Sequence, residues 1–235
     1  MKQYNVNNEM VAVLVSSRRI VRHLRRKKRV CMEAMHNTRA VVQCRAAAKR
    51  VLVPIANGSE EMEAVIVSDV LRRAECEVVI ASVEAERSIC ALRRVTLVAD
   101  TLIGDVCKED FDAIVLPGGM PGAEKLRDCN TLKEMLQAAA KDESTVIAAI
   151  CAAPAVVLQP LGLLDGIKTK TCHPAFASCI ENCQDIAVAD DEVITSRGPG
   201  TAFAFSLALV RRLMGNEVAE EVAAPMCLQY PVVVS

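Results

Sequence analysis

From Lys49 onward, short continuous apolar runs alternate with longer segments in which apolar residues recur at helical spacing. Such runs predict buried strands, and such spacing predicts helices. Strands are expected at Arg50–Ile55, Glu77–Ser82, Asp112–Pro117, Val146–Ile150 and Glu192–Ser196, helices over Ser59–Ala74, Thr131–Lys141 and Phe203–Gly215, and a hairpin-like region around Ser88–Leu102. Apolar strands separated by helices indicate an α/β fold, a mostly parallel sheet with helices on both faces.

The charge distribution divides the chain near residue 48. Residues 1–50 hold 13 Lys and Arg against two acids, whereas the remaining residues hold 15 against 27. We therefore expect a basic extension over residues 1–48 and one folded domain over residues 49–235. The chain has 235 residues, and 52% of them are apolar, which is enough for a sizeable core.

Three interpretations of the basic extension compete. Ser16–Arg29 is too charged to span a membrane and lacks the apolar region of a secretory signal. It could bind nucleic acid, be a solvated arm, or be an organelle transit peptide, which is typically Arg-rich and poor in acids. Val41–Ala48 resembles the processing region of algal chloroplast transit peptides, so we expect a chloroplast address, with mitochondrion or cytoplasm as alternatives. No second basic patch follows and aromatic residues make up 3%, so no nucleic-acid or membrane partner is expected.

The eleven cysteines show no disulfide framework and no CxxC pair. Reduced thiols in an intracellular compartment are the better interpretation. Cys179 and Cys183 form an isolated CxxxC without a second half, so no metal site is expected. GxGxxG and GxxxxGK[ST] motifs are absent from the sequence, and no organic cofactor is expected.

Cys151 lies where a predicted strand ends and a helix is expected to begin. Its neighbours Ala149, Ala152 and Ala153 are small, as a nucleophile on a sharp strand-to-helix turn requires. A helix N-terminus would lower the pKa of the thiol. The alternative is a buried structural thiol, and the spacing alone does not exclude it.

Glu63 lies on an otherwise apolar helix stripe. The residues that share this face are Glu63, Ile66, Val67, Val70, Leu71 and Ala74. A buried, unpaired carboxylate is costly, so Glu63 should keep its proton and find a partner, such as a thiolate. Glu60 and Glu61 are ordinary first-turn acids in this interpretation. The alternative is that Glu63 sits at the edge of the stripe and reaches water.

Two further features follow the predicted strands. Gly118 and Gly119 could present backbone N–H groups to an oxyanion, although the motif taken alone fits a plain glycine turn better. His173 is the single histidine outside the basic extension, and Pro174 biases it toward an extended loop. Together with a cysteine it is a candidate base, although one histidine can also fill a core.

Several motifs in consistent order resemble the DJ-1/PfpI (ThiJ/PfpI) family over about residues 49–228. They are KRVLVPIANGSEEMEAV, VLPGGMPGAEKL, AAICAAPA, TCHPA, TSRGPGT and VAAPMCL. The resemblance implies a flavodoxin-like three-layer sandwich that usually forms homodimers. It also implies that Cys151 is the reactive nucleophile, that Glu63 shares a proton with it, that His173 lies nearby, and that Gly118 and Gly119 are backbone donors.

Family members are described as glutathione-independent glyoxalases, as deglycases of early glycation adducts, and as oxidation-sensing chaperones. We therefore expect a cofactor-free enzyme that attacks glyoxal, methylglyoxal or glycated proteins through Cys151, with donors from Gly119 and Ala152. The alternative is a redox-sensing chaperone whose Cys151 becomes a sulfinate. Ala152 stands where the protease branch has histidine, and Pro174 stands where an amidotransferase would need an acid. Ala153 stands where many relatives have glycine. Its added methyl group would narrow the site and so affect the range of substrates.

Overall fold

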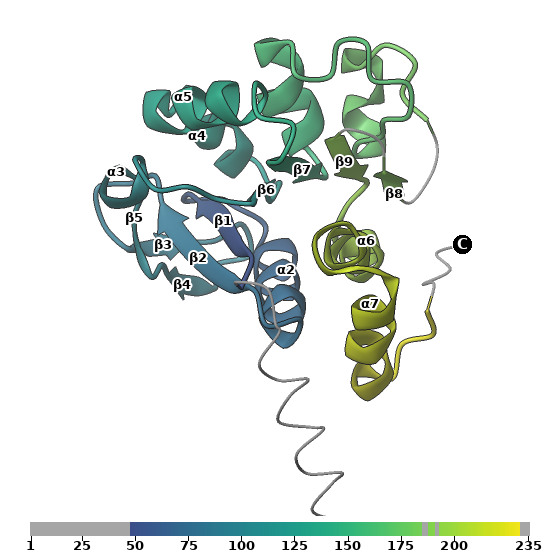
Figure 1. Ribbon diagram of the computed structural model, residues 1–235. Helices are drawn as coiled ribbons and strands as arrows, with labels where there is room; N and C mark the ends of the chain where they lie inside the picture. Colours follow the sequence, from purple (N-terminus) through teal and green to yellow (C-terminus); the bar gives the residue numbers. More distant parts are fainter. Residues whose placement is uncertain (1–47, 185–187, 191–192, 231–235) are drawn as a thin grey trace, which may run out of the picture. The chain divides into compact units, whose positions relative to one another are not determined.

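A computed structural model describes residues 48–184, 188–190 and 193–230, and these residues form a mostly parallel sheet (Figure 1). The seven strands are ordered β5-β2-β1-β6-β7-β9-β8, and all are parallel except β8, which runs antiparallel to β9. Their bounds are β1 Arg50–Ile55, β2 Glu77–Ser82, β5 Thr101–Leu102, β6 Ala113–Leu116, β7 Val146–Ile150, β8 Val188–Asp190 and β9 Val193–Ser196. A separate antiparallel hairpin pairs β3 (Ser88–Cys90) with β4 (Thr96–Val98).

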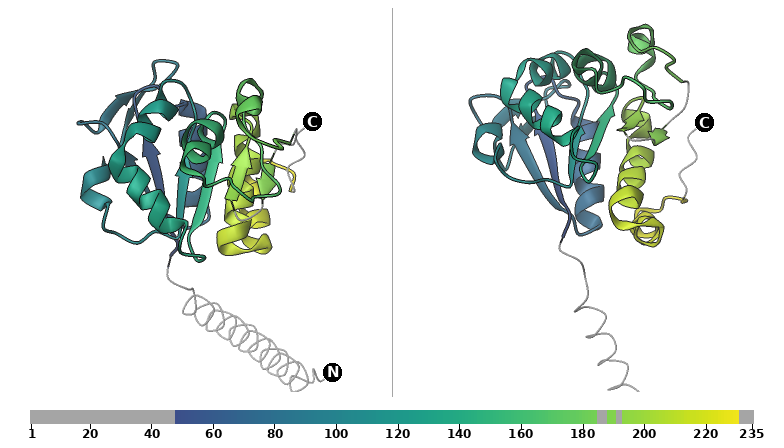
Figure 2. Two further views of the ribbon diagram at one scale, coloured as in Figure 1. Left: turned by 90° about the horizontal axis from the view of Figure 1, so that it is seen from above. Right: turned by 45° about the horizontal axis from the view of Figure 1, so that its top comes forward.

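Helices cover both faces of the sheet, as the two views of Figure 2 show. On one face α2 (Glu61–Arg73) packs against α6 (Ala202–Met214), which in turn contacts α7 (Asn216–Ala223). On the other face α4 (Gly122–Asp128) and α5 (Asn130–Ala139) contact strands β1 and β7, and the short α3 (Ile103–Val106) lies beside β2 and β5. The α/β, flavodoxin-like three-layer fold expected from the sequence is confirmed.

The central strands agree with the sequence pattern because both of their faces are buried. Val51–Ile55 in β1 and all of β6 are fully or almost fully buried, as expected for strands covered by helices on both sides. Strands β1, β2 and β7 have the expected bounds. The sheet order reverses direction between β1 and β6, and ligands of open α/β sheets bind at such switch points, outside the carboxyl ends of the strands.

Three local features differ from the sequence prediction. Helix α2 begins at Glu61 rather than at Ser59, because the Glu60 carboxylate accepts the Glu63 N–H at 2.8 Å and caps the helix. Glu60 and Glu61 are buried rather than ordinary exposed acids, and Glu61 accepts the Arg93 N–H. The segment after Cys151 forms a π-helix over Pro154–Leu158 instead of a regular α-helix.

None of the helices in the described part of the chain has the length and apolar character needed to cross a membrane. The basic extension lies outside the described residues, so the expected transit peptide and the domain boundary at residue 48 stay predictions.

Candidate active site

Cys151 is held in an uncommon backbone conformation directly after β7. Its φ is +65°, in the left-handed region that residues with a side chain rarely adopt. Two hydrogen bonds keep it there: its N–H donates to the Ser196 carbonyl at 2.9 Å, and its carbonyl accepts the His173 N–H at 2.8 Å. The residue is 9% exposed. Strain held in place by neighbouring strands is a feature of functional sites, and here it aims one thiol at the carboxyl edge of the sheet.

Glu63 is completely buried on α2 and points toward the same edge. One carboxylate oxygen, Oε2, accepts the Gly118 N–H at 2.7 Å. Its other oxygen, Oε1, has no hydrogen-bond partner among the described residues. The Cys151 thiol interacts with the Glu63 carboxyl group. A buried carboxylate oxygen without a polar partner is costly, and a proton shared with the thiol relieves that cost. The alternative in which Glu63 reaches water is excluded.

The carboxyl and the thiol both hold their protons more tightly than usual. Burial raises the pKa of Glu63 to about 7, and the charge of Glu60 adds to the rise. The hydrogen bond from the Gly118 N–H acts in the opposite direction and lowers this pKa. Burial also raises the pKa of Cys151 to about 12, and the negative charge of Glu63 contributes next. The expectation that a helix N-terminus lowers the pKa of this thiol was therefore wrong for the resting pair. Once Glu63 carries the proton, its repulsion of a Cys151 thiolate disappears.

Backbone N–H groups surround the sulfur. Hydrogen bonds from Gly119 and Ala152 to Cys151 both favour its thiolate. Gly118, expected to be an oxyanion donor, uses its N–H on Glu63 instead, so its role here is to position the carboxyl. The two donors beside the sulfur are therefore Gly119 and Ala152. Ala153 is fully buried, so its methyl group has no exposed surface through which to narrow the site.

Replacing Gly118 with alanine is expected to damage both stability and the site. An added Cβ would lie 2.6 Å from the Cys151 Cβ and 2.9 Å from the Ala152 nitrogen, closer than real contacts allow. Overpacking of this kind costs about 1–3 kcal/mol, so urea unfolding should show a lower free energy of unfolding. Gly104→Ala is the matched control, because an added Cβ there meets nothing within 4 Å. Equal stability of the two variants would contradict the close approach.

His173 is tied to the site through its backbone. Its φ of −61° and ψ of 135° confirm the extended conformation expected before Pro174. Its Nδ1 accepts the Ala175 N–H at 3.2 Å, and its ring meets Phe176 edge-on. Because Nδ1 accepts this N–H, the neutral ring carries its proton on Nε2, which can donate a hydrogen bond. The His173 backbone is bonded to Cys151, whereas the hydrogen bond found for its ring goes to Ala175.

A hydroxyl cluster behind Cys151 was missed as a part of the site. The side chains of Ser196 and Thr201 are hydrogen-bonded at 2.6 Å, and Thr201 Oγ1 also accepts the Gly198 N–H at 3.1 Å. This cluster fixes the turn after β9, whose Ser196 carbonyl holds the Cys151 N–H. The motif TSRGPGT carried the signal, but sequence alone gave it no role.

The fold and this arrangement define an α/β protein with a strained cysteine at a strand end and a buried glutamate beside it. The model of the DJ-1/PfpI family matches residues 49–212, and the chain belongs to this family.

Individual relatives agree with this assignment. The chain is 43% identical to "Protein DJ-1 homolog B" of Arabidopsis thaliana over 77% of this chain, although it spans only 42% of that protein's length. It is 37% identical to the "Glutathione-independent glyoxalase DJR-1.2" of Caenorhabditis elegans, covering 72% of this chain and 91% of the relative. The solved structure of oxidised Toxoplasma gondii DJ-1 superposes with a TM-score of 0.75 at 43% identity, over 78% of this chain and all of that one.

Proposed function

We propose that this protein is a cofactor-free glyoxalase that converts glyoxal to glycolate and methylglyoxal to lactate. The observation that carries the proposal is the fully buried Glu63, which interacts with the Cys151 thiol and whose Oε1 has no other hydrogen-bond partner among the described residues. A nucleophile and a group that moves protons are the two functions this reaction requires. The relative named as a glutathione-independent glyoxalase supports the same activity.

The first step joins the sulfur to the aldehyde carbon. Cys151 passes its proton to Glu63, and the resulting thiolate attacks the aldehyde to give a hemithioacetal. The N–H groups of Gly119 and Ala152, which already bond the sulfur, lie where they can stabilise the developing oxyanion. Glu63 then gives the proton that it took from Cys151 to that oxygen, which completes the step without a change in oxidation state and leaves Glu63 as a carboxylate.

The second step moves a proton between adjacent carbons. Glu63 takes the proton from the former aldehyde carbon and returns it to the neighbouring carbonyl carbon. The hydroxyl proton of the hemithioacetal passes to the neighbouring oxygen, and the hemithioacetal becomes a thioester that bears a hydroxyl group. One carbon is oxidised and the other is reduced, so no external redox agent is needed. Water then cleaves the thioester. Glu63 takes a proton from the water and passes it to the departing Cys151 sulfur, while His173 assists by donating a hydrogen bond from Nε2, and the hydroxy acid and the free thiol are released.

The test is to measure lactate released from methylglyoxal without glutathione. Enzymatic turnover predicts many lactate molecules per protein chain, whereas a protein pretreated with N-ethylmaleimide should release none. Disappearance of methylglyoxal without lactate would show that the thiols merely trap the aldehyde, and would overturn the proposal. The proposed activity extends to deglycation only if the protein releases lactate from a preformed glycation adduct after free aldehyde has been removed.

A redox-sensing role is the second candidate, and the same donors favour it. Gly119 and Ala152 N–H groups and a protonated Glu63 could hold the oxygens of a Cys151 sulfinate. Intact mass after mild peroxide distinguishes the two functions. Two added oxygens on Cys151 in a protein that releases no lactate would favour the sensor.

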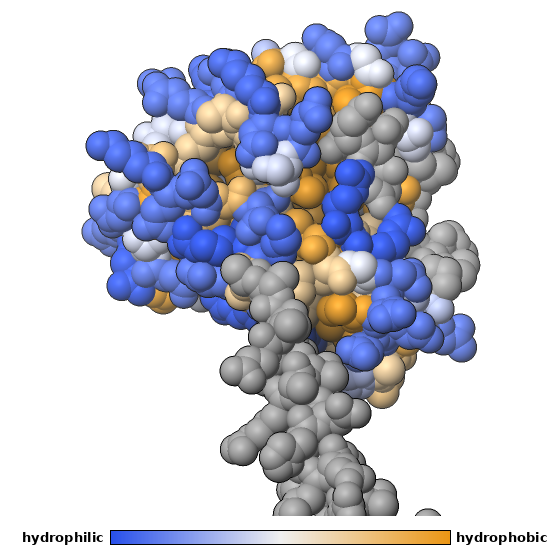
Figure 3. Space-filling model, viewed as in Figure 1, coloured by the Kyte–Doolittle hydropathy of each residue, from blue (hydrophilic) through white to orange (hydrophobic). Residues whose placement is uncertain are grey.

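A homodimer and a chloroplast location stay predictions. Figure 3 shows apolar surface among the charged side chains in the region of α2 and α6. Met62 and Val65 on α2 and Phe203 on α6 are exposed apolar residues, which suit contact with a second copy of the chain.

A further inference from the structure

A pair of cysteines that does not include Cys151 lies beside the site. The Sγ atoms of Cys172 and Cys183 are 3.7 Å apart, and either thiol can donate to the other. The proposed reaction uses neither residue. All nine cysteines in the described part of the chain are free thiols.

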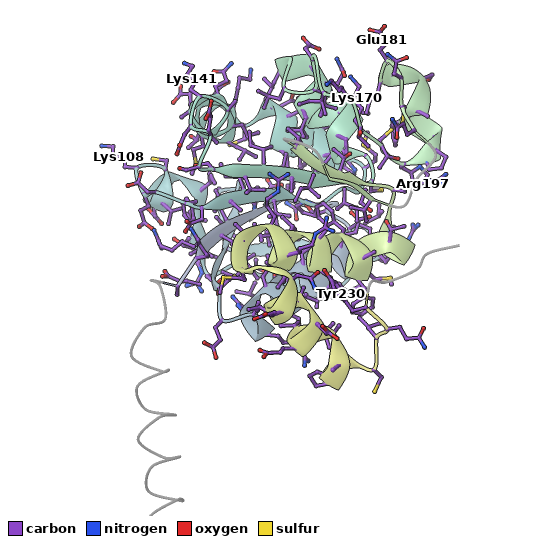
Figure 4. The ribbon with its side chains drawn as sticks, turned by 45° about the vertical axis from the view of Figure 1, so that its right-hand side comes forward. Lys108, Lys141, Lys170, Glu181, Arg197 and Tyr230 are labelled. Carbon is purple, nitrogen blue, oxygen red and sulfur yellow. The ribbon has the colours of Figure 1, made fainter. Side chains whose placement is uncertain are left out.

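Hydrogen bonds immediately beside the two cysteines hold their segments together. The Gln184 N–H donates to the Lys170 carbonyl at 2.9 Å, and the Thr171 hydroxyl donates to the Gln184 carbonyl at 2.7 Å. The Thr171 N–H is anchored in turn on the Thr195 hydroxyl in β9 at 2.9 Å. Lys170 and Glu181, labelled on the upper right of Figure 4, each stand two residues before one of the cysteines. These hydrogen bonds therefore hold the backbone on which the two thiols are in contact.

The two thiols differ in access to solvent. Cys172 is 2% exposed, and burial followed by the charge of Cys183 raises its pKa to about 12. Cys183 is partly exposed, so a small oxidant reaches it first. A disulfide has an S–S length of about 2.05 Å, so the sulfur atoms need only a small approach from contact distance.

We propose that Cys172 and Cys183 form a reversible disulfide when the protein meets a hydroperoxide. The peroxide transfers one oxygen to Cys183, giving a sulfenic acid and releasing an alcohol or water. The Cys172 sulfur then attacks the Cys183 sulfur, and the sulfenic hydroxyl leaves with the Cys172 proton as water. The two thiols together lose two electrons and two protons, and the peroxide is reduced.

The bond would form next to the site without consuming Cys151. Cys172 immediately precedes His173, whose N–H holds the Cys151 carbonyl. The disulfide would pin the His173 segment to the segment at residues 183–184. A thiol reductant restores the pair, whereas a sulfinate on Cys151 resists such reductants.

Peptide mapping after peroxide tests the proposal. Trypsin leaves Thr171–Arg197 as one peptide, so a second cut after Glu181 is needed to separate Cys172 from Cys183. We expect the two fragments to remain linked, lighter by two hydrogen atoms than the sum of their thiol forms, and to separate on reduction. Absence of linked fragments at a peroxide dose that oxidises Cys151 in the same sample would overturn the proposal.

Single variants identify the partners. Cys179 shares a fragment with Cys172, so Cys179→Ala is the matched control and should keep the link. Cys172→Ala and Cys183→Ala should each abolish it, and Cys151→Ser should not affect it. A link that persists in Cys172→Ala would assign the bond to Cys179 and contradict the proposal. Because Cys172 is buried, Cys183→Ala provides the same test at a partly exposed position, with circular dichroism as the check on folding.

Discussion

Replacing Cys151 with serine is expected to lower lactate release from methylglyoxal by roughly 10³-fold or more. A hydroxyl is a far weaker nucleophile than a thiol and is less acidic, so proton transfer to Glu63 yields much less of the reactive anion from serine than from cysteine. Serine is close in size, and the backbone bonds to Ser196 and His173 do not involve the side chain. The folded state should therefore persist.

The measurement pairs a lactate assay with thermal unfolding. Cys107→Ser, at the end of α3, is the matched control and should retain wild-type turnover. If Cys151→Ser kept lactate release within tenfold of wild type while folded, the sulfur would not be the nucleophile. If both variants lost activity equally, the effect would not be specific to the site.

The sheet could be predicted from sequence because its central strands are buried on both faces. Val146–Ile150 has no polar residue to suggest another structure, and its observed bounds match the expected ones. Helix α4 escaped prediction because it is short, begins at Gly122 and follows Pro121, so its helical signal is weak. The π-helix after Cys151 could not be foreseen, because hydrophobic spacing does not distinguish it from an α-helix over five residues.

The side chains of the candidate site could be selected from the sequence, but its backbone contacts could not. Glu63 was identifiable because it interrupts an apolar stripe, and the structure buries it completely. The direction of an N–H group has no signature in sequence, so the bond from Gly118 to Glu63 and the Ser196 carbonyl behind Cys151 appeared only in the structure. The pKa of Cys151 was misjudged for the same reason, since burial and the neighbouring charge depend on the packed fold.

Replacing Glu63 with glutamine is expected to reduce activity and increase stability at the same time. The amide oxygen can still accept the Gly118 N–H, and the amide NH₂ can donate toward the Cys151 sulfur, as a protonated carboxyl would. It cannot take or return a proton, so kcat for lactate release should fall by about 10²–10⁴. The variant should stay folded because Gln nearly matches Glu in shape.

The stability gain follows from the raised pKa of Glu63, from 4.5 to about 7. Between these values the folded protein binds more protons than the unfolded chain, so its free energy of unfolding falls as pH rises through this window. The full fall attributable to this carboxyl is at most about 3 kcal/mol. Glutamine cannot ionise, so Glu63→Gln should lose this pH dependence and exceed wild type most clearly above pH 7.

Urea unfolding of wild type and Glu63→Gln at pH 5 and pH 8 measures this difference. Glu134→Gln on α5, away from the buried pair, is the control for the general effect of removing a carboxylate. A stability difference between Glu63→Gln and wild type that shrinks from pH 5 to pH 8 would contradict the burial of an ionisable Glu63. If Glu63→Gln were more stable but turned over as fast as wild type, Glu63 would not be the group that transfers the proton. We predict that Glu63→Gln has a lower kcat and a higher free energy of unfolding at pH 8. This combination is expected when a buried carboxyl group lowers stability but is required for catalysis.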